Sequence, residues 1–421
     1  MKNPTFWWRN FFLKRQVARS LEFRIWNMEF GKKRKVAVVT GHSCDYVRLK
    51  SVLEEIEKHP ALEYILVVVG SHLLERYGTT IRHIQADGFR VDKTIYTIIE
   101  GETPTTMAKS TGLSAIELAT YFEDAKPDIV LILGEHFEVF SAALTAALMN
   151  IPVAHARGGE VTGTIDESLR HAITKLAHIH FPATEKSRER IIKMGEDSER
   201  VFLVGCPSVD SLLSVRKLGK QELFSHPELD PATKPSGQRP LDPSQPFLLL
   251  IQHPVTTEYG EAYAQIQETL AAVKELDVQT IMLWPNPDAG SELIVKGVRH
   301  FLLKNPMPKL YAYKRFPSEV FINLMRETDC FITNSSSGPS EACYFGTPVV
   351  NVGTRQNGRE RGKNLVDAGY KKDEIVAAAR RQLAHGKYEP EHLYGEPPVA
   401  KKMADILATV DLSNVQKKLA Y

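Results

Sequence analysis

Cysteine is scarce in this chain of 421 residues, and the cysteines present are far apart. They stand at positions 44, 206, 330 and 343, and no two of them form a C-x-x-C pair. This spacing argues against a disulfide framework and against a structural zinc site. It fits a protein of a reducing compartment, so we expect a cytoplasmic location.

The chain also lacks a long apolar run and a strong excess of one charge. No run approaches the roughly 20 apolar residues that span a bilayer, so we expect no integral membrane segment. Lysine and arginine total 53 against 51 acidic residues, giving a net charge of +2. Nucleic-acid-binding proteins usually carry a larger or more concentrated basic surface, so nucleic acid is not an expected partner. The 43% hydrophobic content is ordinary for a globular protein.

The N-terminal residues 1–33 differ in composition from the rest of the chain. The first 27 residues hold six basic residues and a single acid, Glu22, and aromatic residues such as Trp7 and Trp8 interleave with the basic ones. We expect a disordered tail, with an organelle transit peptide or a membrane-surface segment as alternatives. A protein that starts at Met28 should then keep its stability.

From residue 34 onward, short runs of valine, isoleucine and leucine alternate with helical patterns. Strands are expected at 36–40, 64–70, 128–134, 151–156, 247–253, 280–286, 330–334 and 348–353. Helices are expected at 47–58, 113–125, 141–150, 262–276, 318–327 and 339–345. Continuous apolar strands that alternate with helices are typical of parallel sheets covered on both faces.

A proline-rich, polar segment at 216–246 divides this pattern into two halves. The sequence therefore predicts an α/β protein with two Rossmann-like, doubly wound domains, 34–215 and 247–395, which face each other across a cleft. The segment 216–246 is a linker or surface excursion. Residues 396–421 are a C-terminal helix and tail, whose helix is expected to pack back across the domain boundary. Ligands bind such sheets at the carboxyl ends of the strands.

In the first half, three loops after strands carry polar groups. TGHSCDY (40–46) contains Asp45, which is either a helix cap or a site acid. GEHFE (134–138) places Glu135 and His136 at the edge of the crevice. RGGEVTGTIDESLRH (157–171) begins with Arg157.

That third loop combines glycines, acids and a helix start. Gly158 and Gly159 allow the backbone to approach a ligand, and Thr164 with Glu167 forms the pattern of a capping box. Two acids, Glu160 and Asp166, bracket the start of that helix.

In the second half, His253 follows one strand, and Asn286 and Asp288 follow the next. TNSSSGPSE (333–341) is the strongest motif. Serine residues follow the end of an expected strand, and Pro339 stands where a helix would begin. Amides at such a helix start form a phosphate site. GTRQNGRERGKN (353–364) adds the arginines 355, 359 and 361, whose guanidinium groups suit a diphosphate.

Five segments resemble the hydrolysing branch of the UDP-N-acetylglucosamine 2-epimerase family, and most closely the epimerase half of the animal bifunctional epimerase/kinase. They are ALMNIPVAHARGGEVTGTIDESLRHAITKLAH (147–178), GCPSVD (205–210), QHPVTT (252–257), PNPDAGS (285–291) and FGTPVVNVGTRQNGRE (345–360). The resemblance extends over roughly residues 34–395. It implies a glycosyltransferase-B-like fold and a homo-oligomer, either a dimer or a tetramer.

The resemblance also implies a UDP-sugar substrate and a reaction that needs no metal and no redox cofactor. UDP is eliminated to give a 2-acetamido-glycal, and water then adds with inversion at C2. The diphosphate would bind Ser335 and Ser336 in the loop that includes Ser337 and Gly338. Glu341 would bind the ribose hydroxyls and Arg355 would lie near the nucleotide. The residues His253, Asn286 and Asp288 would line the pocket.

Three motifs depart from the family pattern. Arg-Ala-Asp-Tyr is replaced by Ser43-Cys44-Asp45-Tyr46, Gly-Asp-Arg by Gly134-Glu135-His136, and Glu-Gly-Gly-Glu by Arg157-Gly158-Gly159-Glu160. An arginine cannot serve as a general base.

Three hypotheses remain open at this point. The chain is a hydrolysing 2-epimerase that releases UDP and N-acetylmannosamine or a close relative, a catalytically silent UDP-sugar binder, or a transferase-type enzyme in the same fold. We expect Glu135, with His136 as its partner, to carry proton transfer, and Arg157 to pair with Glu160. Asp45, Glu160 and Asp166 are the alternative proton-transfer groups, and His253 is a further candidate.

Overall fold

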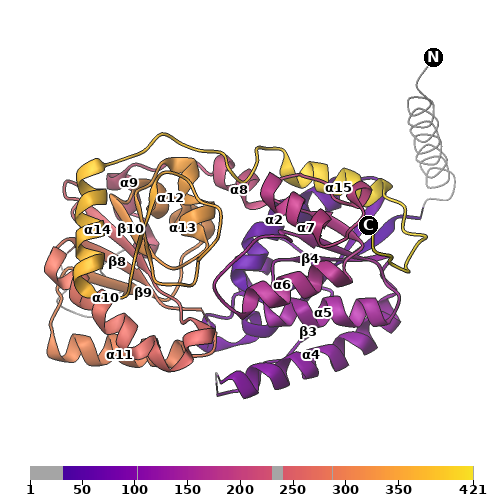
Figure 1. The fold of residues 1–421 in the computed structure, drawn as a ribbon, viewed down its shortest axis with the longest axis horizontal. Helices are drawn as coiled ribbons and strands as arrows, with labels where there is room; N and C mark the ends of the chain where they lie inside the picture. Colours follow the sequence, from indigo (N-terminus) through magenta and orange to yellow (C-terminus); the bar gives the residue numbers. More distant parts are fainter. Residues whose placement is uncertain (1–31, 102, 230–239, 287, 421) are drawn as a thin grey trace, which may run out of the picture.

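Two six-stranded parallel sheets lie at the centre of the two halves of the molecule (Figure 1). The structure is a computed structural model that describes residues 32–101, 103–229, 240–286 and 288–420. Most of the tail expected at 1–33 therefore lies outside the described residues.

The N-terminal sheet has the strand order β3-β2-β1-β4-β5-β6. Its strands are β1 (Arg34–Thr40), β2 (Leu62–Val69), β3 (Lys93–Ile95), β4 (Ile129–Leu133), β5 (Val153–Ala156) and β6 (Ile179–Phe181). The helices of this half are α2 (Ser43–Lys58), α3 (Ile81–Ala86), α4 (Pro104–Ala125), α5 (Phe137–Leu148), α6 (Ile165–Leu176) and α7 (Glu185–Lys193).

The C-terminal sheet has the order β12-β11-β10-β7-β8-β9. Its strands are β7 (Phe247–Ile251), β8 (Gln279–Leu283), β9 (Leu310–Tyr313), β10 (Cys330–Thr333), β11 (Val349–Val352) and β12 (Leu365–Ala368). Its helices are α10 (Ala262–Leu276), α11 (Ser291–Lys304), α12 (Ser318–Glu327), α13 (Ser337–Ser340) and α14 (Lys372–His385).

Both sheets have the same topology, with the first strand of each sheet next to its fourth. β1 pairs with β4, and β7 pairs with β10, in parallel register. On the two sides of each of these pairs, successive strands are added toward opposite edges of the sheet. Doubly wound sheets bind ligands at such switch points. The two Rossmann-like domains expected from the sequence are confirmed, and the switch points locate the site.

Alternating residues of the strands pack on opposite faces of each sheet. In β1, Val36 and Val38 belong to one core cluster, whereas Ala37 and Val39 belong to another, which includes Leu118 of α4. The C-terminal sheet divides in the same way, with Leu248 and Leu250 on the face covered by α10, α11 and α14. Burial on both faces explains why these strands are continuous apolar runs.

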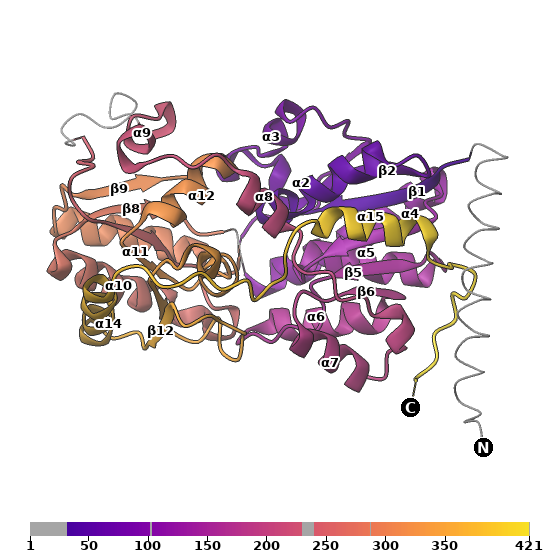
Figure 2. The same ribbon diagram turned by 90° about the horizontal axis from the view of Figure 1, so that it is seen from above.

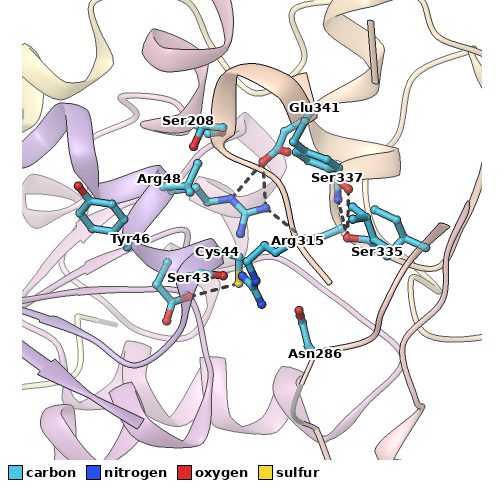
Figure 3. A pocket seen from close by; sticks show the side chains of 18 of the residues that line it. Ser43, Cys44, Tyr46, Arg48, Ser208, Asn286, Arg315, Ser335, Ser337 and Glu341 are labelled. Carbon is cyan, nitrogen blue, oxygen red and sulfur yellow. Dashed lines mark hydrogen bonds and ion pairs between the residues drawn. The ribbon is translucent and has the colours of Figure 1, made fainter. Parts of the chain in front are cut away.

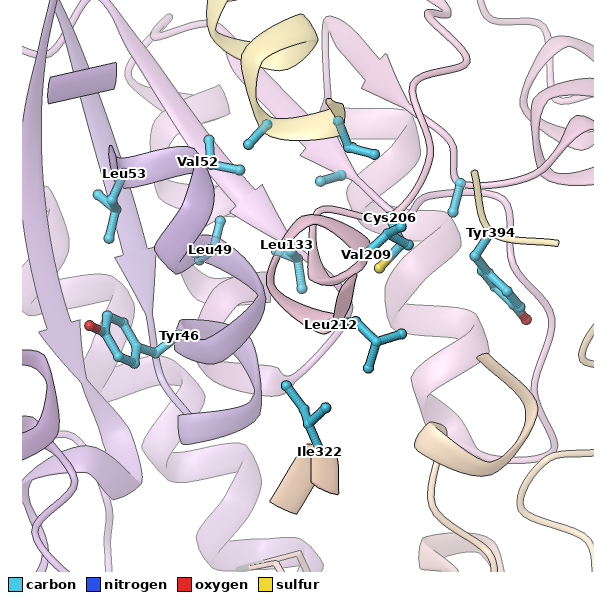
Figure 4. Packing of buried hydrophobic residues seen from close by; sticks show 14 of the residues in the cluster. Tyr46, Leu49, Val52, Leu53, Leu133, Cys206, Val209, Leu212, Ile322 and Tyr394 are labelled. Atoms are coloured by element: carbon cyan, nitrogen blue, oxygen red, sulfur yellow. The ribbon is translucent and has the colours of Figure 1, made fainter. Parts of the chain in front are cut away.

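One hydrophobic cluster continues from one domain into the other. It includes Leu49 of α2, Val209 and Leu212 of α8 (Ser208–Ser214), and Ile322 of α12 (Figure 4). Apolar packing therefore supports the relative position of the two sheets.

The chain returns to the N-terminal domain at its end. The helix α15 (Val399–Thr409) lies beside α2 in Figures 1 and 2, as expected for a helix that packs back across the boundary. Asp210 accepts hydrogen bonds from the backbone N–H groups of Val399 and Ala400 at the start of α15. No helix among the described residues is long and apolar enough to cross a bilayer.

The segment expected as a linker or surface excursion, 216–246, has buried anchors. It contains α9 (Lys220–Phe224), and its leucines 218, 223 and 229 are at most 2% exposed. Residues 230–239 of this segment lie outside the described residues. Leu241, after that gap, is also buried in the same core cluster, so apolar side chains fix the segment to the body of the protein on both sides.

Candidate active site between the two domains

A pocket with a cavity volume of about 590 Å³ lies between the domains, at the switch points of both sheets. This volume is in the range of small-molecule sites. Of the residues expected in the site, those that line the pocket are Ser43, Asp45, Glu135, His136, Arg157, Asp166, His253, Asn286, Ser335, Ser336, Ser337, Glu341 and Arg355. Glu160, Asp288 and Gly338 lie behind this lining.

The first turn of α2 brings Cys44 and Asp45 to the pocket, and His42 lies just behind them at the end of the loop after β1. The N-cap of α2 is His42, whose ring accepts from the Cys44 N–H, so the expected capping role of Asp45 is wrong. Gly41 is required here, because a Cβ on it would lie 2.6 Å from the Cβ of Glu138. This close approach holds the start of α2 against the start of α5.

Cys44 lies between two imidazoles. Its Sγ is 3.0 Å from His42 Nδ1 and 3.8 Å from His136 Nε2, and the two rings stack with centroids 5.1 Å apart. Burial raises the pKa of the Cys44 thiol, but the hydrogen bond and charge of His136 outweigh burial and lower it overall. Burial lowers the pKa of His42 to about 3, so this ring is neutral.

Asp45 is 2% exposed and has no arginine partner among the residues that the structure describes. Its Oδ1 lies 4.0 Å from His136 Nε2, and its Oδ2 is buried without a hydrogen-bond partner there. Burial raises the pKa of this carboxyl to about 7, more than the neighbouring histidines lower it. Asp45 is thus a carboxyl group at the pocket with a free oxygen.

The Glu135 carboxylate pairs with arginines and not with His136, its expected partner. Its Oε1 lies 2.6 Å from Arg170 and 3.8 Å from Arg359, and no ion pair joins it to His136 among the described residues. Burial raises the pKa of Glu135, but the two guanidinium groups outweigh burial and hold it well below its usual range. The expected Glu135–His136 pair is therefore wrong, because Arg170 of α6 takes the carboxylate.

Arg157 pairs with Glu160, as expected. Its Nε and Nη2 donate to the two carboxylate oxygens at 2.8 and 2.9 Å, and both side chains are buried. Arg359 lies 3.4 Å from the same carboxylate. Arg157 has φ +65°, a left-handed conformation that costs about 1 kcal/mol or more for a residue with a side chain. The buried ion pair holds this strained residue in place.

The glycines that follow Arg157 serve packing rather than a ligand. A Cβ on Gly159, which has φ +77°, would lie 2.3 Å from the backbone oxygen of Ser187 in α7. The expected capping box is also incomplete: Thr164 accepts from the Asp166 N–H, whereas Glu167 accepts from the Thr162 N–H. The Glu167 carboxylate thus fixes the loop before α6 by accepting a hydrogen bond from the loop's backbone.

In the second domain, His253 and Asn334 fix the ends of β7 and β10 to each other. The Asn334 side chain accepts from the His253 N–H at 2.7 Å and donates to the His253 carbonyl at 2.8 Å. The His253 Nδ1 accepts from the Asn286 N–H at 3.0 Å. Burial, together with the charge of Arg355, lowers the pKa of His253 well below its usual range. His253 is therefore a neutral hydrogen-bonding group.

The serine loop does not open a long helix. The helix expected at 339–345 is broken into α13, which has four residues, and a 3-10 turn over Ala342–Phe345. Two of its amides have partners, since the Ser335 N–H donates to Thr333 and the Ser337 N–H to Ser335. Ser335 and Ser336 still line the pocket, so the loop offers hydroxyl groups rather than a strong helix dipole.

Arginines that the sequence analysis did not select complete the pocket (Figure 3). Arg48 donates from Nε and Nη2 to Glu341 Oε1 at 3.1 and 2.9 Å, and from Nη2 to Ser336 at 3.3 Å. Arg315 reaches into the pocket beside Cys44 and has no carboxylate partner among the described residues. Arg355, which the sequence analysis did select, also lines the pocket, and its Nη2 lies 3.6 Å from Asp288 and 4.0 Å from Asp166.

Comparison with known proteins shows which family this chain belongs to. The family model described as UDP-N-acetylglucosamine 2-epimerase matches residues 54–408. A UDP-N,N'-diacetylbacillosamine 2-epimerase (hydrolyzing) of Legionella pneumophila is 35% identical over 379 residues, which cover 90% of this chain and 97% of that protein. The chain belongs to the UDP-N-acetylglucosamine 2-epimerase family.

Other members of the family give the same result. A UDP-N-acetylglucosamine 2-epimerase of Neisseria meningitidis is 30% identical over 362 residues, which cover 86% of this chain and 90% of that protein. The crystal structure of a Neisseria meningitidis epimerase bound to UDP-GlcNAc superposes with a TM-score of 0.71 at 19% identity, covering 89% of this chain and 99% of that one. The resemblance and the glycosyltransferase-B-like fold expected from the sequence are confirmed.

Proposed function

We propose that this protein is a hydrolysing 2-epimerase of UDP-linked 2-acetamido sugars. The observation that carries the proposal is the pocket between the switch points of the two sheets, in a chain that belongs to this family. One wall holds the Asp45 carboxyl group, which has no arginine partner among the described residues, and the other holds serine hydroxyls. The reaction breaks the C1–O bond to UDP and the C2–H bond, and water then adds oxygen to C1 and a proton to C2. Its relatives favour this function over a silent binder or a transferase.

The nucleotide end lies on the C-terminal domain in this proposal. Ser335 and Ser336 donate to the diphosphate, and Arg315 is the lining arginine free to pair with a phosphate oxygen. A guanidinium without a carboxylate partner binds a phosphate oxygen without first breaking an ion pair. Arg48 holds Glu341 and Ser336 in one orientation for the ribose.

Proton transfer falls to Asp45 rather than to Glu135. Both acids line the pocket, but Arg170 and Arg359 hold the Glu135 carboxylate, whereas one oxygen of Asp45 has no partner among the described residues. An oxygen without a partner can take the C2 proton without breaking an ion pair. The arginines around Glu135 and Glu160 leave these acids to shape the pocket.

Two sugars fit the family. The N. meningitidis relative acts by name on UDP-N-acetylglucosamine, and the L. pneumophila relative acts by name on UDP-N,N'-diacetylbacillosamine. A Campylobacter jejuni relative that is 31% identical is named for GDP- and UDP-N,N'-diacetylbacillosamine. We propose that this chain takes a sugar of this 2-acetamido class.

The test is to incubate the purified protein separately with UDP-N-acetylglucosamine and UDP-N,N'-diacetylbacillosamine and to follow UDP release. Release of UDP together with the free sugar inverted at C2 is the expected result for one of the two. Binding of both without UDP release would contradict the proposal and support a silent binder.

The oligomeric state and location are part of the same proposal. Two large apolar side chains on the adjoining helices α4 and α5, Ile116 and Leu148, are 67% and 76% exposed, and this supports a homo-oligomer. All four cysteines are free thiols, which supports a reducing compartment such as the cytoplasm. Light scattering on the protein as it elutes from a size-exclusion column measures the oligomeric state directly.

A further inference from the structure

Three metal-ligating side chains converge beside the pocket, and two of them, Cys44 and His136, line it. The ligand atoms of His42, Cys44 and His136 all lie within 4.8 Å of one another. The thiol is 3.0 Å from His42 Nδ1 and 3.8 Å from His136 Nε2, and Asp45 Oδ1 is 3.8 Å from the same sulfur. Bond lengths of zinc to sulfur and nitrogen place such ligand atoms about 3.5 Å apart around a tetrahedral ion.

The chemistry of the three groups selects the ion. One thiolate and two imidazoles, each of which ligates in its neutral form, prefer a borderline transition metal such as Zn²⁺ or Co²⁺ over Mg²⁺ or Ca²⁺, which require oxygen ligands. Three protein ligands leave a fourth position open, as in catalytic rather than structural zinc sites.

One further observation points to a ligand here. Asp45, whose Oδ1 is next to the Cys44 thiol, is 2% exposed, yet its Oδ2 has no hydrogen-bond partner among the described residues. A buried carboxylate oxygen without a partner, next to three metal-ligating atoms, suits a bound ion or a water molecule on it.

We propose that His42, Cys44 and His136 bind a divalent transition metal ion of the zinc class at the side of the interdomain pocket that Cys44 and His136 line. Small rotations of His42 and His136 close the remaining distance between their nitrogens. Because Cys44, Asp45 and His136 line the pocket, a water molecule in the open coordination position would lie beside Asp45, which would accept a hydrogen bond from it. The bound ion, which is a Lewis acid, would then lie beside the same pocket that Arg315 lines.

The test is a titration of the purified, metal-stripped protein with Co²⁺ alone, without sugar nucleotide. A thiolate bound to Co²⁺ gives a charge-transfer absorption, so the expected result is one equivalent of Co²⁺ with this band, displaced by Zn²⁺. The variant Cys44→Ser should lose the band, and His136→Gln should weaken Co²⁺ binding by about tenfold or more. Cys330→Ala, which changes a buried thiol of β10, is the matched control and should bind as the unchanged protein does.

Three results would overturn the proposal. They are an absence of the band in the unchanged protein, an unchanged band in Cys44→Ser, and an unchanged affinity in a folded His136→Gln protein. Because no substrate is present, the outcome is independent of the proposed epimerase activity, which the UDP-release assay measures separately.

Discussion

Arg48 of α2 and Glu341, which follows α13, join the two domains through two hydrogen bonds to one carboxylate oxygen, at 3.1 and 2.9 Å. Both side chains are about nine-tenths buried at the wall of the pocket. Because Arg48 also contacts Ser336, a single guanidinium organises the residues proposed to bind ribose and diphosphate.

Arg48→Met should therefore weaken UDP binding by about 1.5–3 kcal/mol, the range for hydrogen bonds to charged groups. The substitution removes a positive charge and leaves the buried Glu341 carboxylate without its partner. Isothermal titration calorimetry with UDP measures the effect. Arg216→Met is the matched control, because Arg216 forms an exposed pair with Glu222. Equal UDP affinity in both variants would contradict the role of Arg48.

Asp45→Asn should reduce UDP release by about 10²–10⁴-fold, the usual contribution of a positioned acid or base. The amide keeps the shape of the carboxyl group, so UDP affinity should change little. Glu135→Gln should mainly lower the melting temperature, because Arg170 then loses its carboxylate. Kinetics and calorimetry on both variants separate the two roles. Loss of turnover in Glu135→Gln with an unchanged melting temperature would reverse the assignment.

Arg157→Glu should destabilise the protein by about 3–5 kcal/mol and give no gain in turnover, although it restores the acid of the family motif. The new carboxylate would face Glu160, with Arg359 as the nearest remaining cation. Thermal unfolding measures the loss. The exchanged pair Arg157→Glu/Glu160→Arg should recover part of the stability. A stable Arg157→Glu protein with raised turnover would show instead that the arginine replaces a needed acid.

Glu196 should make stability depend on acid pH. Burial raises its pKa, but hydrogen bonds from His180, Lys175 and Lys417 outweigh burial and lower it from 4.5 to about 2. A pKa lowered in the folded state stabilises the protein above pH 4.5, and this stability is lost as the pH falls toward 2.

Glu196→Gln should therefore cost about 1–3 kcal/mol at neutral pH and progressively less in acid. Urea unfolding from pH 7 to pH 3 measures both curves. The exposed Glu199 provides the control, Glu199→Gln. Parallel curves for the Glu196 variant and the unchanged protein would contradict this account.

The strands that the sequence analysis missed share one property. β3, β6, β9 and β12 are the edge strands of the two sheets. These strands have only three or four residues, and β3, β9 and β12 have exposed or half-buried positions, so none of the four forms the continuous apolar run that identified the central strands. The central strands, and with them the switch points, were predictable for the same reason.

The candidate site was predictable where loops follow central strands, and not elsewhere. Glu135, His253 and the serine loop were found because each follows such a strand. Arg48 lies within a helical pattern and Arg315 follows the edge strand β9, so no local signal marked either residue. The sequence also could not show which residue pairs with Glu135, because Arg170 meets this carboxylate only through the packing of α6.

The most direct test of the central claim is the reaction run in D₂O, with NMR analysis of the released sugar at C2. Elimination and readdition exchange the C2 proton with solvent, so the account predicts free UDP and a sugar that is inverted at C2 and carries one deuterium there. UDP release with the original proton and configuration kept at C2 would contradict it, because simple hydrolysis leaves the C2–H bond intact.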